Sequence, residues 1–122
     1  MKKVLVVDDS PSVRQQVGLA LKQAGFEIVE AVDGTDGVAK IDGDPSIGVV
    51  ICDVNMPRMN GLELVEAVHR NPKHVNLPIV MLTTEGQPQL IQRAKKAGAK
   101  GWIVKPFKAN LLVAAVKKLM PA

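Results

Sequence analysis

Five short apolar runs, separated by segments with a helical repeat, constrain the fold of this 122-residue chain more than any other feature. The runs are residues 4–8 (VLVVD), 27–32 (EIVEAV), 48–53 (GVVICD), 78–83 (PIVMLT) and 101–105 (GWIVK). Elsewhere apolar residues recur three and four positions apart, as in Val13, Val17, Leu21 and Ala24, which is the spacing of one helix face. Five strands alternating with five helices predict an α/β sandwich with a parallel central sheet and right-handed crossovers.

Local signals mark where the helices begin and end. Ser10 precedes a proline and predicts the N-cap of the first helix, and Gly25 predicts its end. Asn60 with Glu63 three residues later predicts a capping box at the start of the third helix. Only short connections join these elements, so we expect one domain over residues 1–122, without a linker or an effector domain.

The composition predicts a soluble globular protein. Hydrophobic residues make up 47% of the chain and charged residues 23%. No apolar run is long enough to span a bilayer, so no membrane contact is expected. The single cysteine, Cys52, cannot form an internal disulfide, which fits a reducing cytoplasm. We expect a cytoplasmic monomer or weak dimer.

The positive charge is concentrated in the last third of the chain. Residues 1–84 carry 8 basic and 11 acidic side chains, whereas residues 85–122 carry 8 basic and 1 acidic. Nucleic-acid binding is one interpretation, but no cluster of aromatic residues accompanies the lysines to stack on bases. Solvated helix faces and a docking surface for an acidic protein are the other interpretations, and both stay open. Nucleic acid is therefore an unfavoured partner.

Four of the five predicted strands end in chemically useful side chains. They are Asp8 and Asp9 after the first strand, Asp53 after the third, Thr83 and Thr84 after the fourth, and Lys105 after the fifth. In open parallel sheets, ligands bind beyond the carboxyl ends of the strands. We therefore expect these side chains to form one site at that edge.

The three acids favour a metal site that handles phosphoryl groups. Carboxylates gathered within about 5 Å repel one another by roughly 3 kcal/mol per pair at an effective dielectric near 20. A hard divalent cation offsets this repulsion, and oxygen ligands with room for water favour Mg²⁺. A carboxylate can itself accept a phosphoryl group and form an acyl phosphate. Asp53 is the best candidate acceptor, because the third strand should be central in the sheet.

Taken together, these residues carry a family resemblance. Asp8-Asp9, Asp53 within DVNMPRMNG, Thr83 and Lys105-Pro106-Phe107 resemble the receiver domain of two-component response regulators over essentially the whole chain. The resemblance implies a flavodoxin-like (βα)5 three-layer sandwich, a parallel sheet of strand order 2-1-3-4-5, and a cis Lys105–Pro106 bond. The chain is similar to the stand-alone, CheY-type regulators in particular, because we expect no effector domain after the last helix.

The resemblance also implies a function and a metal. It implies a phosphorylation-activated signalling module, which is not an enzyme in its own right but assists its own phosphorylation and dephosphorylation. Asp53 would receive the phosphoryl group from a histidine kinase. Asp9, Asp53 and the main-chain carbonyl of Asn55 would bind Mg²⁺ directly, and Asp8 would act largely through water.

The remaining site residues would contact the phosphoryl group or set its lifetime. The resemblance implies that the Thr83 hydroxyl and the main-chain amide of Thr84 donate hydrogen bonds to its oxygens. Lys105 would pair first with Asp53 and then with the phosphoryl group. The side chains at positions 55 and 85, Asn55 and Glu85, would tune the rate of dephosphorylation.

Trp102 stands three residues before Lys105, where the family has its switch aromatic. The resemblance implies that Trp102 turns inward when Thr83 moves toward the phosphoryl group. This change would alter the face formed by the helix that ends at Gly98, the strand 101–105 and the last helix. A downstream protein target is expected to bind at this face. A packing role is the alternative for Trp102.

Several alternatives stay open at this point. Chemotaxis-like control competes with a phosphorelay intermediate and with a non-chemotaxis single-domain regulator. An aspartate phosphatase would need the pattern D-x-D after the first strand, whereas the sequence has DDSPS there. DNA binding through the basic last third of the chain is a remote alternative.

The two histidines are not expected to bind a metal. His69 and His74 lie five residues apart, with a proline between them, and are expected to be exposed.

Overall fold

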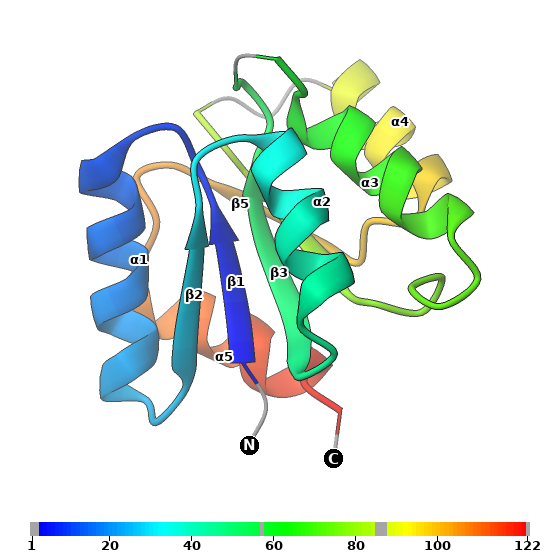
Figure 1. The fold of residues 1–122 in the computed structure, drawn as a ribbon. Helices are drawn as coiled ribbons and strands as arrows, with labels where there is room; N and C mark the ends of the chain where they lie inside the picture. The colour runs from blue at the N-terminus through cyan, green and yellow to red at the C-terminus, as the bar shows by residue number, and fades with distance from the viewer. Residues whose placement is uncertain (1–2, 57, 85–87, 122) are drawn as a thin grey trace.

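The computed structural model describes residues 3–56, 58–84 and 88–121, in which helices cover both faces of a five-stranded sheet (Figure 1). The elements are β1 (Lys3–Val7), α1 (Pro11–Gln23), β2 (Glu27–Ala31), α2 (Gly34–Gly43), β3 (Ile47–Asp53), α3 (Gly61–Arg70), β4 (Ile79–Thr83), α4 (Pro88–Ala97), β5 (Gly101–Val104) and α5 (Ala109–Leu119). The strands pair in parallel in the order β2-β1-β3-β4-β5. The predicted flavodoxin-like (βα)5 fold is confirmed.

The sheet separates two apolar layers. Helices α1 and α5 pack on one face, and α2, α3 and α4 pack on the other (Figure 1). Successive residues of a strand point to opposite faces, so Val4 and Val6 contact the first layer while Leu5 and Val7 contact the second. Both faces are covered, which explains why the strands read as continuous apolar runs. Within the described ranges, no helix is both long and apolar enough to cross a membrane.

The predicted helix boundaries are confirmed by their hydrogen bonds. The Ser10 hydroxyl accepts from the main-chain N–H of Val13 at 3.3 Å, which caps α1. The Asn60 side chain accepts from the N–H of Glu63, and the Glu63 side chain accepts in return from the N–H of Asn60. Gly25 ends the first helix with a φ of 96°, a left-handed conformation that glycine adopts readily.

The expectation that both histidines are exposed is wrong. His69 is partly buried, and its ring nitrogens lie 2.9 Å from the carbonyl oxygens of Ala97 and Leu77. It therefore joins the end of α3 to the end of α4 and to the segment that precedes β4. His74 is also partly buried, and its Nε2 lies 3.2 Å from a carboxylate oxygen of Asp42. Sequence spacing could not show these contacts, because they depend on how the helices pack.

Candidate functional site

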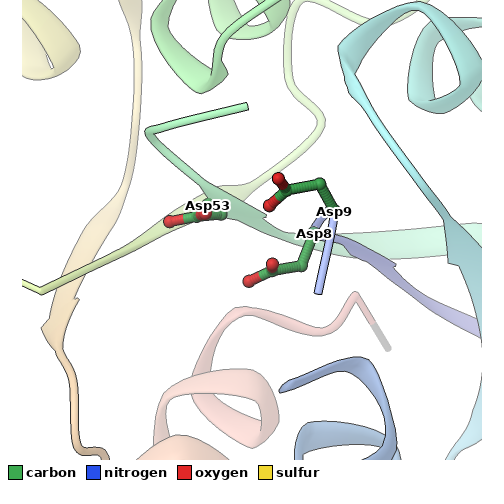
Figure 2. Close-up of side chains that lie close together, drawn as sticks. All are labelled: Asp8, Asp9 and Asp53. Atoms are coloured by element: carbon green, nitrogen blue, oxygen red, sulfur yellow. The ribbon is translucent and has the colours of Figure 1, made fainter. Parts of the chain in front are cut away.

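The sheet topology brings Asp8, Asp9 and Asp53 together. Strands β1 and β3 are parallel neighbours, with Val7 opposite Cys52, so the residues that follow Val7 emerge beside the end of β3. One ligand atom from each of the three carboxylates lies within 4.8 Å of the others. Figure 2 shows the three side chains together at the ends of their strands. The cluster has the location that the sequence predicts.

The three acids differ in burial, which separates their roles. Asp8 is 1% exposed and Asp53 is 6% exposed, whereas Asp9 is exposed. Asp8 also accepts a hydrogen bond from the main-chain N–H of Ser10 at 2.9 Å. Asp8 is thus buried and fixed by a hydrogen bond, whereas Asp9 is open to solvent.

Lys105 contacts two of these acids at once. Its ammonium nitrogen lies 3.1 Å from Asp8 Oδ2 and 3.3 Å from Asp53 Oδ1. The main-chain N–H of Lys105 donates to the carbonyl of Thr83 at 2.6 Å, and the Lys105–Pro106 bond is cis. The resemblance implies a pair between Lys105 and Asp53, and the contact with Asp8 is additional. One cation therefore bridges the two buried carboxylates.

Three other predicted site residues, Thr83, Thr84 and Asn55, lie at or just beyond the carboxyl ends of β3 and β4. Thr83 is buried at the end of β4, which pairs with β3, and Thr84 is exposed directly after it. Asn55 is exposed, two residues beyond Asp53 in the loop that follows β3. Glu85 lies outside the described residues. The Thr83 hydroxyl and the Thr84 amide thus lie at the end of β4, which stands between β3, the strand that ends in Asp53, and β5, the strand that Lys105 follows.

Burial and neighbouring negative charges both raise the pKa of Asp53, the candidate phosphoacceptor. Burial raises the pKa of the Asp53 carboxyl, the charges of Asp8 and Asp9 raise it further, and Lys105 opposes them. Burial also raises the pKa of the Cys52 thiol on the same strand, with Asp53 and Asp8 adding to the effect. The thiol therefore stays protonated, and it is a poor metal ligand or nucleophile.

The donor set fits the metal that the sequence predicts. Three carboxylates offer only oxygen atoms, and those atoms lie close enough to share one ion. One lysine leaves this cluster with an excess of negative charge, which a hard divalent cation would offset. Asp8, Asp9, Asp53 and the main-chain carbonyl of Asn55 are the groups that would hold Mg²⁺.

Arg14 is a supporting residue that sequence reasoning missed. Its guanidinium donates to the main-chain carbonyl of Asp8 at 2.6 Å and to the carboxylate of Glu30 at 3.1 Å. It therefore ties the loop after β1, which carries the two acids, to strand β2. The sequence carries a weak signal of this role. Arg14 stands near the N-terminus of α1, where a positive charge is unfavourable unless it has a partner elsewhere.

Trp102 lies on the α4 side of the sheet. It is opposite Met81 in the register of β4 and β5, and it is partly buried against the apolar layer under α2, α3 and α4. A cavity of about 70 Å³ between α4 and β5 is lined by Trp102, Ile91 and Ala94, among others. Its indole N–H is buried and has no hydrogen-bond partner among the described residues. Trp102 is thus a residue of β5, in the predicted docking face, and its side chain packs beneath α4.

The fold and the acidic edge of its sheet define the class of the protein. The sequence model of the response regulator receiver domain matches residues 4–117. The chain therefore belongs to the response regulator receiver domain family.

Its relatives are chemotaxis proteins of the CheY type. The chain is 41% identical over 111 residues to chemotaxis protein CheY1 of Helicobacter pylori, covering 90% of each sequence. It is 40% identical to the CheY homolog of Campylobacter jejuni, covering 90% of this chain and 85% of that protein. The solved structure of CheY4 from Vibrio cholerae superposes with a TM-score of 0.92 at 44% identity, covering 98% of this chain and 99% of that one. The chain is thus a receiver domain of the chemotaxis CheY type, which is a component of two-component systems.

Proposed function

We propose that Asp53 accepts a phosphoryl group from a histidine kinase and that this modification switches a docking face for a downstream protein. The observation that carries the proposal is the position of Lys105, whose ammonium lies 3.1 Å from Asp8 and 3.3 Å from Asp53. Because this ammonium also has Asp8 as a partner, it can pair with the Asp53 carboxylate before the transfer and with the phosphoryl oxygens after it.

The transfer is a displacement at phosphorus. A carboxylate oxygen of Asp53 attacks the phosphorus atom of the kinase phosphohistidine, and a phosphorus–oxygen bond forms as the phosphorus–nitrogen bond breaks. The leaving ring nitrogen keeps the electron pair of that bond and takes up a proton. Bound Mg²⁺ supplies positive charge against the carboxylates and the phosphoryl oxygens. Asp53 needs no general base, because its ionised carboxylate is already the nucleophile.

The neighbouring residues position and stabilise the product. Asp8, which is buried and hydrogen-bonded, keeps Lys105 within reach of both the acceptor and the phosphoryl oxygens. The Thr83 hydroxyl and the Thr84 main-chain N–H donate to those oxygens from the end of β4. Asn55 and Glu85 set the access of water to the acyl phosphate, which controls how long the modification lasts.

The signal reaches the surface through Thr83 and Trp102. Phosphorylation adds about two negative charges and strong acceptor oxygens, which draw Thr83 toward Asp53 and free space for Trp102 to move inward. The face formed by α4, β5 and α5 changes in response. This face carries exposed apolar residues, Val104 at 47% and Leu111 at 57% exposure, and it lies in the basic last third of the chain. A protein segment with apolar and acidic residues fits it.

The names of similar proteins support a pathway for this chain. The proteins of Helicobacter pylori and Campylobacter jejuni that match this chain are named as chemotaxis proteins. These names support a chemotaxis-like pathway as the one in which this chain acts. Its downstream target is a protein, because the basic last third of the chain has only Trp102 and Phe107 as aromatic residues and so lacks a cluster that would stack on bases.

Intact-protein mass spectrometry tests the proposal. The chain is incubated with Mg²⁺ and a small acyl-phosphate donor, with and without the substitution Asp53→Asn. We expect one labile phosphoryl adduct on the unsubstituted chain and none on the variant. Asp42→Asn, an exposed acid on α2, is the matched control and should keep the adduct. Absence of an adduct on the unsubstituted chain with either Mg²⁺ or Mn²⁺ would contradict the proposal.

A further inference from the structure

Asp33 is a buried acid outside the site described above. It lies between β2 and α2, is 1% exposed, and caps α2 by accepting from the main-chain N–H of Asp36 at 2.8 Å. Capping uses Oδ1 and leaves Oδ2 for a second contact. That oxygen forms an ion pair with the guanidinium of Arg58. The N–H of Asp36 and the charge of Arg58 hold the pKa of the Asp33 carboxyl below its usual range.

Arg58 belongs to the loop between β3 and α3, which also carries Asn55. Its side chain is mostly exposed except at this contact. Its φ is 64°, in the left-handed region that is unfavourable for residues other than glycine. Such a conformation persists where surrounding contacts hold it. The ion pair with Asp33 is one of the contacts that hold Arg58.

A second contact joins the same two segments. The main-chain N–H of Gly34 donates to the carbonyl of Met59 at 3.1 Å. A Cβ atom at Gly34 would lie 2.5 Å from that carbonyl oxygen, so only glycine allows the approach. The start of α2 and the loop after β3 therefore touch through the Asp33–Arg58 ion pair and the Gly34–Met59 hydrogen bond.

The base of the loop is fixed separately. The main-chain N–H of Gly61 donates to the carbonyl of Val54 at 2.9 Å, and the Asn60 capping box fixes the start of α3. Asn55 lies between this closed base and the contact with α2, and it is exposed. The position of its carbonyl relative to Asp53 therefore depends on where the outer part of the loop is held.

We propose that the Asp33–Arg58 ion pair is a clamp that positions the metal-binding loop, so that Mg²⁺ affinity depends on two residues that do not touch the metal. This inference rests on the proposed function, because it takes the carbonyl of Asn55 as a metal ligand. Asp33 and Arg58 are positioning residues. Groups that orient metal ligands commonly change metal affinity about 10- to 100-fold when removed.

The test compares Mg²⁺ dissociation constants, measured by the NMR shifts of backbone amides near Asp53. Asp33→Asn is the decisive variant, because asparagine caps a helix as well as aspartate does but cannot form the ion pair. We expect Asp33→Asn and Arg58→Gln each to weaken Mg²⁺ binding about tenfold. The double variant should be no weaker than either single variant, and Arg58→Lys should recover most of the affinity.

Asp44→Asn is the matched control. Asp44 also combines an ion pair, to Lys3 at 2.9 Å, with a hydrogen bond from the main-chain N–H of Ser46 at 3.0 Å. It lies before the amino end of β3, whereas the site lies at the carboxyl ends of the strands. This control should bind Mg²⁺ as the unsubstituted chain does. The thermal midpoint of Asp33→Asn should stay within a few degrees of the unsubstituted chain, which separates positioning from loss of folding.

The outcomes separate the clamp from the proposed function. An unsubstituted chain that binds Mg²⁺ and accepts a phosphoryl group, with Asp33→Asn and Arg58→Gln equal to it in affinity, would overturn the clamp alone. Additive losses in the double variant would also overturn it, because the two residues would not act as a pair. An unsubstituted chain that binds no Mg²⁺ would overturn the proposed function and the clamp together.

Discussion

The ammonium nitrogen of Lys105 lies 3.1 Å from a carboxylate oxygen of Asp8, an acid that is 1% exposed and lies beside the proposed phosphoacceptor. The distance from the same nitrogen to Asp53 is 3.3 Å. Asp8 therefore gives Lys105 a second partner, one that the proposed modification of Asp53 would leave in place. The lysine can move from the Asp53 carboxylate to a phosphoryl oxygen while it keeps its partner.

Removal of Lys105 should raise Mg²⁺ affinity and impair signalling. The ammonium and the metal compete for Asp8 and Asp53, so Lys105→Ala removes a competing positive charge. We expect the affinity for Mg²⁺ to rise by about 1 kcal/mol, or about fivefold. A calorimetric titration with Mg²⁺ measures this change. Asp9→Asn, which removes a negative charge from the cluster, is the control and should weaken Mg²⁺ binding. A lower Mg²⁺ affinity in Lys105→Ala would contradict the competition between the ammonium and the metal.

Asp53→Asn should stabilise the metal-free chain at neutral pH. The pKa of Asp53 is raised in the folded state, chiefly by burial, so its ionised form opposes folding. This penalty is absent at pH values below its ordinary pKa and grows as the pH rises through its raised pKa. Urea unfolding with a chelator present should show a gain of about 1 kcal/mol at pH 7. The gain should shrink toward pH 4, and a gain that grows toward low pH would contradict the assignment.

The two histidines should differ in their effect on stability. His69→Ala removes two partly buried contacts with carbonyl oxygens, at 2.9 Å each, and should cost about 2 kcal/mol of unfolding free energy. His74→Ala removes only a contact with the exposed Asp42 and should cost less than about 1 kcal/mol. Chemical denaturation measures both. A larger loss for His74→Ala would contradict the packing described for α3 and α4.

Trp102 fluorescence should report the switch. Trp102 is the only tryptophan, and its indole N–H is buried without a hydrogen-bond partner among the described residues. A movement toward or away from α4 should change its emission maximum or intensity when Mg²⁺ binds or when an acyl-phosphate donor is added. Asp53→Asn, which removes the proposed phosphoacceptor, should lose the response to the donor. An unchanged spectrum in both cases would argue against the switch role.

The residues at the ends of the strands could be predicted from the sequence, because parallel strands bring their carboxyl ends to one edge. Asp8, Asp9 and Asp53 lie together for this reason, and strand order came from the family resemblance. The contacts of Arg14, Asp33 and His69 could not be predicted. Each reaches across a loop or between helices, and side-chain periodicity carries no information about those distances. Asp33, for example, pairs with Arg58, which is 25 positions further along the chain.

The most direct test of the central claim is to locate the phosphoryl group. The chain is treated with an acyl-phosphate donor, with Mg²⁺ or with a chelator, and is digested rapidly in acid before peptide fragmentation by mass spectrometry. We predict that the phosphoryl group is found on Asp53, and only in the sample with Mg²⁺. A phosphoryl group on another residue, or one on Asp53 that forms equally well with the chelator, would contradict the account.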